Sequence, residues 1–560
     1  MAAALSDLPD DLLRHVLSLT PAKEAASTAV LSRRWRSLWR TCGAVNIDSR
    51  SYGSSAEARE SFVRGVKAAL DASRPIRKLT IHVELDAETY AEVNKRYRSL
   101  NKPDLNLVDA VVSHPAARGV EVIHVGAHRI LGFGFVQQGF HTLSYGALPS
   151  EALAVLHITN CFLRFTPPPG TTTFPLLAEL RLHGCSLSVM GLQAVINVSP
   201  KLATLHLQHI SFYYSDDDDG EEEEEEQGVT CYRLRCPSVT ALVLKNCSWV
   251  KGCMELDVPR LRCLTFKGPV RSGLVDGQVS LKVKSQEQLD LLLDRVDVHL
   301  TDDNIGTSRS ENNKIRVPFW QSLRNFSKAK VLKLKLDYPI DQVAVVHKKD
   351  QDHQLHCNDA MFGNLTRLEL EGSFVDAPAG KVAAAAAIAN LLHCCPVLRD
   401  LRLNLRKALR SPSITRSDFR LVSLGRARLD FDESVEHFKH CRRNSLATDD
   451  GQHDFDDTYD EVSDIPGLTG HSFKCLQSCL RRVTLQLRMK NNDPADCFGT
   501  QLAKFFSTDA MALEELYIDD GIHRICEHMN LVKIGRWAAT NSPKKGKPAT
   551  GGITVLPHET

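Results

Sequence analysis

Two groups of histidine and cysteine side chains have a spacing that could hold a metal ion. His353, His356 and Cys357 supply imidazole nitrogens and a thiolate, which are ligands that Zn²⁺ prefers. His124 and His128 stand four residues apart, as the two histidines of a zinc hydrolase do on one helix face. The first group lacks a second ligand pair, and the second lacks the glutamate that acts as general base. We therefore predict a surface loop at residues 353–357 and no metal site at either group.

The sequence contains no motif of nucleophilic, phosphate-transfer or metal-assisted catalysis. A P-loop, a G-x-S-x-G elbow, an H-E-x-x-H pair and paired C-x-x-C sets are all missing. The prediction is accordingly no catalytic residue, no metal and no cofactor.

Three cysteines, Cys161, Cys185 and Cys247, recur at one position of a repeating pattern of leucines. The pattern L-x-x-L-x-L-x-x-C/N-x-L is that of a leucine-rich repeat, in which a short strand is followed by a turn at the cysteine position. A small side chain buried at that turn is the preferred explanation of the three cysteines. Redox or metal chemistry is the less favoured alternative.

The pattern predicts a parallel stack of strands along most of the chain. Leu153 and Leu177 are 24 residues apart, and Leu177 and Leu202 are 25 apart, which is the period of this repeat. Clear copies are Leu153/Leu156/Ile158, Leu177/Leu180/Leu182, Leu202/Leu205/Leu207, Val239/Leu242/Leu244, Leu261/Leu264/Phe266, Leu365/Leu368/Leu370, Leu398/Leu401/Leu403 and Leu513/Leu516/Ile518. Weaker copies are Ile76/Leu79/Ile81, Val331/Leu334/Leu336 and Leu480/Val483/Leu485.

A recurring proline is a second sign of the repeats, independent of the leucines. It stands two residues before the first repeat position, where it ends the preceding helix or turn and favours extended backbone. These prolines are Pro175, Pro200, Pro237, Pro259 and Pro396.

Two acidic stretches interrupt the pattern. Residues 216–226 read DDDDGEEEEEE, and their mutual repulsion predicts a disordered insertion. Such a segment is either a solvated loop without a role or a means of steering a basic partner. A polar stretch over 449–464 is predicted to be a loop, and residues 271–315 and 341–360 carry no clear repeat.

Composition excludes several classes of protein. Among 560 residues, 69 Lys and Arg balance 68 Asp and Glu, so the net charge of +1 is a poor footprint for a nucleic-acid binder. The longest largely apolar run, Val382–Leu392, has 11 residues including Asn390, too few to span a bilayer, and its alanines predict a buried helix. Sixteen scattered cysteines without a basic, apolar leader at Met1–Ala4 lead us to expect reduced thiols, in the nucleus, the cytoplasm or both.

The N-terminal 45 residues predict three short helices with more apolar side chains than so small a unit can bury. Pro9 suits the first turn of one helix, in which Leu12, Leu13, Val16 and Leu17 make an apolar stripe. Ser32 can cap a third helix. In that helix, Trp35 and Trp39 follow Leu31 at helical spacing, with arginines on the other sides.

This segment resembles the F-box of plant proteins. The resemblance rests on Leu8-Pro9, Asp11-Leu12-Leu13, Val16-Leu17-Ser18, Pro21-x-Lys23-x-Ala25 and Val30-Leu31-Ser32-Arg33-Arg34-Trp35 with Trp39. An F-box binds a Skp-type adaptor and, through it, a cullin. The resemblance implies that the adaptor contacts, or the packing beneath them, come from Leu8, Pro9, Leu12, Leu13, Val16, Leu17, Val30, Leu31 and Trp35.

Residues 465–540 have a strand–helix–strand order that looks like the FBD-type domain of plant F-box proteins. We expect an α/β chain with an F-box at 1–45 and a curved leucine-rich-repeat solenoid at 46–464. In that solenoid, parallel strands would line the concave face, and helices or irregular segments the convex face. An FBD-like region at 465–540 and a disordered tail at 541–560 would follow.

The resemblance implies a substrate-recognition subunit of an SCF-type ubiquitin ligase. It would hold a target protein on the repeats without contributing catalytic residues, and would bind neither nucleic acid nor membrane. One alternative is a scaffold or sequestering protein outside a ligase. A more remote one is a DNA-binding regulator that uses the arginine-rich third helix.

Overall fold

A computed structural model describes most of the repeating elements of the chain. Residues 216–226, residues 353–357 and all but the last residue of 449–464 lie outside its described part, so the predictions made for them stand as predictions. Within the described part, no helix is long and apolar enough to cross a membrane. The described ranges are 8–52, 56–73, 75–85, 107–129, 141–149, 151–164, 173–213, 231–248, 253–269, 281–283, 293–301, 313–345, 361–408, 464–487, 498–519 and 552–554.

The chain forms two compact units. The first comprises Met1–Thr265 with Gly273–Leu291, and the second comprises Phe266–Ser272 with Leu292–Thr560. Strand β14 (Cys263–Pro269) contains the boundary between them.

Short helices open unit 1, as the sequence predicts. They are α1 (Asp10–Leu19), α2 (Ala22–Ser27), the 3-10 turn η2 (Thr28–Val30), α3 (Arg33–Leu38) and the 3-10 turn η3 (Trp39–Thr41). Ser32 caps α3 by accepting a hydrogen bond from the backbone N–H of Trp35, as expected. Pro9 does not lie in the first turn of α1 but precedes it, and its carbonyl accepts the first helical hydrogen bond from Leu13.

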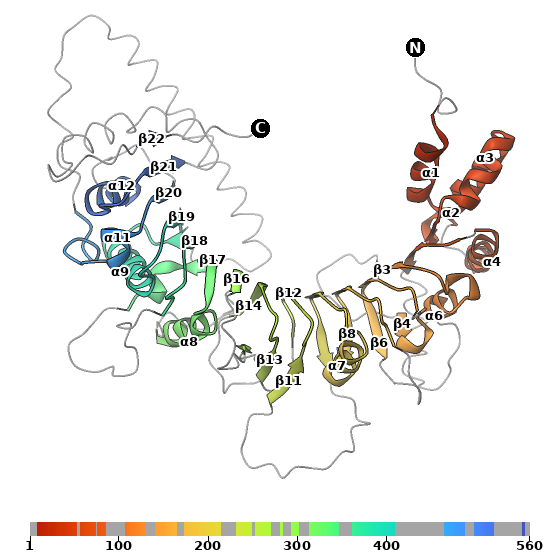
Figure 1. Ribbon diagram of the computed structural model, residues 1–560, viewed down its shortest axis with the longest axis horizontal. Coiled ribbons are helices and arrows are strands. Elements are labelled where there is room, and N and C mark those ends of the chain that lie inside the picture. Colours follow the sequence, from red (N-terminus) through yellow and green to blue (C-terminus); the bar gives the residue numbers. More distant parts are fainter. Residues whose placement is uncertain are drawn as a thin grey trace, which may run out of the picture. The chain divides into compact units, whose positions relative to one another are not determined.

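A parallel sheet follows in unit 1, and its strands coincide with the predicted leucine pattern (Figure 1). Leu156 of β5 lies beside Leu180 of β7, which lies beside Leu205 of β9. Alternate residues of these strands are buried, so one face of the sheet supplies the core. In spatial order the strands are β1 (Ala44–Asp48), β2 (Lys78–Leu85), β3 (Val122–Arg129), β5 (Val155–Thr159), β7 (Glu179–His183), β9 (Thr204–Gln208) and β12 (Ala241–Lys245).

Helices and short strands cover the core face of this sheet (Figure 1). The helices are α4 (Ala56–Ala72), α6 (Leu107–Val112) and α7 (Val189–Asn197). One parallel sheet is β10 (Ser211–Tyr213), β8 (Ser186–Ser188), β6 (Cys161–Arg164) and β4 (His141–Ser144), and another is β11 (Cys231–Arg235), β13 (Cys253–Asp257) and β15 (Leu281–Val283).

A left-handed residue ends the strand in four successive repeats. Asn160, Gly184, His209 and Asn246 have φ values of 57°, 62°, 52° and 50°, and each directly follows its strand. Asparagine, histidine and glycine tolerate this conformation better than other residues. The turn redirects the chain, so Cys161 and Cys185, the next residues, enter the core.

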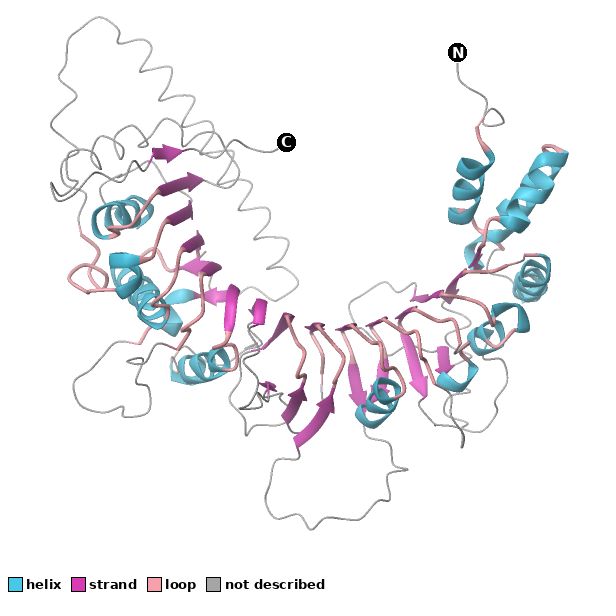
Figure 2. Ribbon diagram, viewed as in Figure 1, coloured by secondary structure: helices cyan, strands magenta, loops and turns pink. Residues whose placement is uncertain are grey.

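Unit 2 repeats the same arrangement, with helices along one side of a parallel sheet (Figure 2). Its strands in spatial order are β16 (Leu293–Thr301), β17 (Ala329–Pro339), β18 (Arg367–Phe374), β19 (Asp400–Lys407), β20 (Arg482–Leu487), β21 (Glu515–Asp519) and β22 (Gly552–Thr554). The helices are α8 (Asn313–Arg324), α9 (Pro378–Cys394), α11 (Lys474–Ser478) and α12 (Phe498–Asp509), with a 3-10 turn η7 (Ile340–Val343).

Two predictions for unit 2 are confirmed. Most of the alanine-rich run Val382–Leu392 is buried within α9, and the C-terminal region has the expected order β20, α12, β21. Three residues of the segment predicted as a disordered tail, Gly552–Thr554, are strand β22 beside β21. The described part of the chain is α/β with parallel sheets.

The predicted register was wrong at one repeat. The copy assigned to Val331/Leu334/Leu336 is displaced by two residues, because Leu332 and Leu334 pair with Leu368 and Leu370. Ala329, which is fully buried, holds the first repeat position. Leucine occurs at every second residue of this strand, so the leucine pattern alone allowed both registers.

Among the strands without a predicted repeat, β3 and β16 nevertheless carry the three buried repeat positions. These positions are Val120, just before β3, with Ile123 and Val125 in β3, and Leu293/Val296/Val298 in β16. Valine and isoleucine fill the same buried sites as leucine there. The stretch 271–315, in which no repeat was recognised, therefore contains a strand of the main sheet of unit 2.

Candidate functional site

Helix α1 presents two apolar faces. Leu13 and Leu17, one turn apart, are 0% and 2% exposed and form the core of the helical module. Leu12, Val16 and Leu19 fall at i, i+4 and i+7 on another face and are 51%, 43% and 67% exposed. A helix of a self-contained module would normally place charged residues there, so this face is suited to contact another protein.

A second exposed apolar pair lies between α2 and α3. Val30 and Leu31 are 87% and 65% exposed, directly before the Ser32 cap. Behind them, Trp35, Leu38 and Trp39 turn inward and join Leu13 and Leu17 in one cluster. The chain thus buries the tryptophans, which are its largest apolar side chains here, and leaves aliphatic ones in water.

An ion pair ties α3 to the start of α1. The Arg34 guanidinium lies 2.6 Å from the Asp10 carboxylate, and it also donates to the backbone oxygen of Leu8 at 2.6 Å. Asp10 and Asp11 stand in the first turn of α1, where the helix dipole favours negative charge. This contact fixes the exposed residues of α1 relative to those that precede α3.

In the structure, some of the predicted site residues are exposed, and others are buried in the core beneath them. Pro9, Leu12, Val16, Val30 and Leu31 are exposed, Leu8 is half-buried, and Leu13, Leu17 and Trp35 form the core beneath them. Leu19 was not among the predicted site residues, although its spacing from Leu12 and Val16 puts it on the same helix face. The surface residues Leu12, Val16, Leu19, Val30 and Leu31 are called the apolar surface below.

The helical module is joined to the first strand of the sheet by polar contacts. The Asn46 side chain on β1 donates to the backbone oxygens of Ser18 and Thr20, at 2.7 and 3.0 Å, at the end of α1. The Ser51 hydroxyl donates to the Glu24 carboxylate at 2.6 Å. Each bond links residues more than 20 positions apart, so the joint is tertiary and not a flexible linker.

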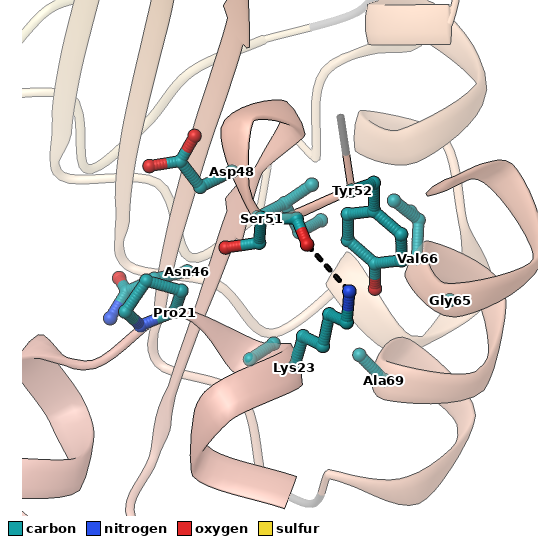
Figure 3. A pocket seen from close by; sticks show the side chains of 11 residues that line it. Pro21, Lys23, Asn46, Asp48, Ser51, Tyr52, Gly65, Val66 and Ala69 are labelled. Atoms are coloured by element: carbon teal, nitrogen blue, oxygen red, sulfur yellow. Dashed lines mark hydrogen bonds between the residues drawn. The ribbon is translucent and has the colours of Figure 1, made fainter. Parts of the chain in front are cut away.

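Lys23 lies at the centre of this joint (Figure 3). Its ammonium donates to the backbone oxygen of Ser51 at 2.5 Å and stands 4.5 Å from the centre of the Tyr52 ring. Tyr52 packs edge-on against Phe62 of α4, and burial together with the Glu24 charge raises the pKa of its phenol. The pocket drawn there has room for about one water molecule (about 10 Å³), so it is a joint and not a ligand site.

The residues considered for metal or redox chemistry have other roles in the described part. The ring of His124 stacks on that of His157, with centroids 4.4 Å apart. The Cys185 thiol donates to the Ile158 carbonyl in the neighbouring repeat, and burial raises the pKa of Cys185 and Cys247 to about 12. Such thiols are poor nucleophiles and poor ligands. Among the described residues, no group of three His, Cys, Asp or Glu side chains could hold a metal ion.

A helical module with an exposed apolar surface, followed by parallel strands with the pattern L-x-x-L-x-L, is the arrangement of an F-box followed by leucine-rich repeats. Comparison with known families agrees. The F-box domain model matches residues 5–44, and the model for the LRR repeats of the FBD-associated F-box protein At5g56370 matches residues 108–348. The chain therefore carries an F-box and FBD-associated leucine-rich repeats, the combination found in plant F-box/LRR-repeat proteins.

Curated relatives from Arabidopsis thaliana support this. The chain is 28% identical over 221 residues to the putative F-box/LRR-repeat protein At3g58880, covering 38% of this chain and 43% of the relative. It is 24% identical over 340 residues to the F-box/LRR-repeat protein At5g38396, covering 56% and 61%. A putative FBD-associated F-box protein, At3g12840, shares 54% identity over 48 residues, covering 9% of this chain and 26% of the relative. The chain spans about half the length of the first relatives it matches.

Proteins of this class generally act in substrate recognition by SCF ubiquitin ligases, in which the F-box binds a Skp-type adaptor. The two matched models leave residues 465–540 uncovered, so their assignment as FBD-like stays a prediction.

Proposed function

We propose that this protein is the substrate-recognition subunit of an SCF-type ubiquitin ligase. α1, α2 and α3 act as a three-helix F-box that binds a Skp-type adaptor and thereby a cullin. The repeats form a curved solenoid whose concave strand face binds a target protein. Ubiquitin transfer then follows from raised local concentration, without a catalytic residue of this chain. We place this activity in the nucleus, the cytoplasm or both.

The apolar surface is the observation that carries the proposal. Val30 is 87% exposed although its neighbours Trp35 and Leu38 are buried within the same small module. Burying such side chains against a partner gains about 1.5–3 kcal/mol each. The joint around Lys23 then holds the adaptor side of the protein in a fixed position relative to the first repeat.

The test is direct binding of the full chain to a purified plant Skp-type adaptor, measured by calorimetry. Val30→Asp and Leu31→Asp should each weaken binding by about tenfold or more, because a charge would have to be desolvated in the interface. Met190→Asp is the matched control. Met190 is also apolar and 63% exposed, but it lies on α7, and we expect less than about a twofold change.

The proposal fails if the Val30 and Leu31 variants bind as tightly as the wild type, or if Met190→Asp loses as much. Circular dichroism of each variant separates lost contact from lost folding. If adaptor binding holds but target abundance does not respond to proteasome inhibition, the chain acts instead as a scaffold or sequestering protein.

A DNA-binding role for α3 is less well supported by the geometry. Arg34 already pairs with Asp10, and Trp35 and Trp39 occupy the inward side of the helix. DNA binding that weakens steeply with salt and is lost in an Arg33→Gln/Arg36→Gln/Arg40→Gln variant would favour this role.

A further inference from the structure

The outward face of the sheet in unit 1 carries a row of imidazoles. The strand register places His124 of β3 beside His157 of β5, His157 beside Arg181 of β7, and Arg181 beside His206 of β9. A parallel row one step further along the strands contains His82, His183 and Lys245. Neighbouring strands lie about 4.8 Å apart, so these side chains form a continuous surface, called the histidine face below.

Among the side chains that the structure describes, positive charge on the histidine face exceeds negative charge. The carboxylates with described side chains are Asp48, which pairs with Arg50, and Glu179, which pairs with Arg181 and lies 2.8 Å from the His157 imidazole. Glu84 stands further along β2, in register with His128. Lys78 and Lys245 form no ion pair with any described residue. The face therefore offers two cations whose charge is not compensated by a neighbour.

Burial and the neighbouring cations both lower the pKa of two imidazoles on this face. Burial lowers the pKa of His124 to about 4, and the charges of His157, Lys78 and Arg181 add to the effect while Glu179 opposes it. The pKa of His206 is lowered as well, first by burial and then by Lys245, with Gln208 opposing and Arg181 and His183 contributing. A bound anion would oppose the contribution of the neighbouring cations to these shifts and so favour protonated imidazole.

Two further features indicate the chemistry of the occupant. The Nε2 atom of His206 is buried without a hydrogen-bond partner, so protonation would leave it ready to donate. The first positions of the strands carry apolar Val122, Val155 and Ala241 in register around Glu179 and Thr204. A mixed surface of cations, imidazoles and aliphatic side chains fits a polypeptide better than a nucleic-acid backbone.

The corresponding face of unit 2 differs because its charges are already paired. Lys333 lies 2.6 Å from Glu369, and Lys335 lies 2.5 Å from Glu371 on the next strand. An incoming acidic group would have to displace a carboxylate there. The uncompensated charge is thus a property of the histidine face and not of the repeat in general.

We propose that the histidine face binds an acidic segment of the target protein, whose carboxylates pair with Lys78 and Lys245. This inference rests on the proposed function and names the kind of target. From β2 to β12 is five strand steps, or about 24 Å, which about seven residues of extended chain span. Binding is coupled to proton uptake by His124 and His206, so it strengthens as the pH falls.

The test uses the full chain and a fluorescent octaglutamate peptide at low salt, with a Gly-Ser octapeptide as the neutral probe. Octaglutamate should bind at pH 7.5, and lowering the pH to 6.0 should tighten binding several-fold. Lys78→Gln/Lys245→Gln should weaken it about fivefold or more. Lys333→Gln/Lys335→Gln, which removes the same charge from the paired face of unit 2, should change it less than about twofold.

A His124→Asn/His206→Asn variant should lose the tightening between pH 7.5 and 6.0. The proposal is overturned if both lysine pairs give the same loss, if the neutral peptide binds equally, or if octaglutamate does not bind. Tighter binding of an oligonucleotide of equal charge would overturn the assignment to a polypeptide. Adaptor binding is measured on the same samples: its loss contradicts the F-box proposal, and its retention with no octaglutamate binding contradicts only this one.

Discussion

The ammonium of Lys23 lies 4.5 Å from the centre of the Tyr52 ring and donates to the backbone oxygen of Ser51. Lys23 belongs to α2 of the F-box, whereas Tyr52 follows the first strand of the sheet. The contact therefore connects the module that we propose binds the adaptor with the array that we propose binds the target. A cation–π contact of this kind stabilises the folded protein by about 0.5–1 kcal/mol at a partly exposed site.

A methyl group at Gly65 should disturb this joint. Gly→Ala within a helix normally stabilises by about 1 kcal/mol, but a Cβ at position 65 would overlap the Tyr52 hydroxyl. Overpacking costs about 1–3 kcal/mol, so Gly65→Ala should lower the stability of unit 1 by about 1 kcal/mol. Urea unfolding followed by tryptophan fluorescence would measure it.

The matched control removes the Tyr52 hydroxyl that the new Cβ would overlap. In a Tyr52→Leu background, Gly65→Ala should become neutral or stabilising, since only its helix propensity remains. If Gly65→Ala destabilises both backgrounds equally, the steric explanation is wrong.

Gly184 should not tolerate alanine. Its φ of +62° is left-handed, and a Cβ there would overlap the Asn160 side chain, which donates to the Ala127 carbonyl at 2.8 Å. We expect Gly184→Ala to lower the free energy of unfolding of unit 1 by about 1–3 kcal/mol. Gly119→Ala, with no atom near its Cβ, should change it by less than about 0.5 kcal/mol. Equal effects at both glycines would contradict the proposed cause.

The stability of unit 1 should fall as the pH drops from about 6.5 to about 4. Burial and neighbouring cations lower the pKa of His124 to about 4 from an ordinary 6.5. In that interval the unfolded chain takes up a proton at residue 124 that the folded chain does not, which favours unfolding. His124→Asn should flatten the dependence of the urea midpoint on pH. An unchanged slope would show that other groups govern it.

Reversing one charge of the Lys–Glu pairs between β17 and β18 should destabilise unit 2. Lys335→Glu would place a second carboxylate beside Glu371 on the adjacent strand, and we expect a loss of about 1 kcal/mol. Adding Glu371→Lys should recover most of it, and high salt should weaken both effects. A double-mutant cycle by urea unfolding gives the coupling energy. If Glu371→Lys adds to the loss instead, the pair does not stabilise the sheet.

The repeating strands could be predicted wherever leucine marks the buried positions. Leu156, Leu180 and Leu205 were assigned from spacing alone and occupy neighbouring strands. The strand at Leu293–Thr301 was not recognised because valine takes two of its three repeat positions. The error at Val331 has a different cause: leucines at 332, 334 and 336 satisfy the pattern in either of two registers, and only the neighbouring strand decides between them.

The helical module that carries the candidate site could be predicted, but not which of its apolar residues are exposed and which are buried. Leu12 and Leu13 are adjacent and chemically identical in the sequence, yet one is 51% exposed and the other fully buried. That difference depends on where Trp35 and Trp39 pack, which is a tertiary property. The histidine face was missed because its members lie on different strands and come together only through the register.

β9 and β12 pair directly, with Leu205 beside Leu242, although β10, β11 and the acidic residues 216–226 lie between them in the chain. The left-handed turn at His209 ends one strand, and Pro237 stands shortly before the next. The number of residues between these two positions therefore does not determine the register of the two strands. This makes the repeat a natural insertion site. A fluorescent protein or an affinity tag placed within 216–226 should leave the strand pairs of the sheet unchanged, giving a reporter for the proposed binding of adaptor and target by the full chain.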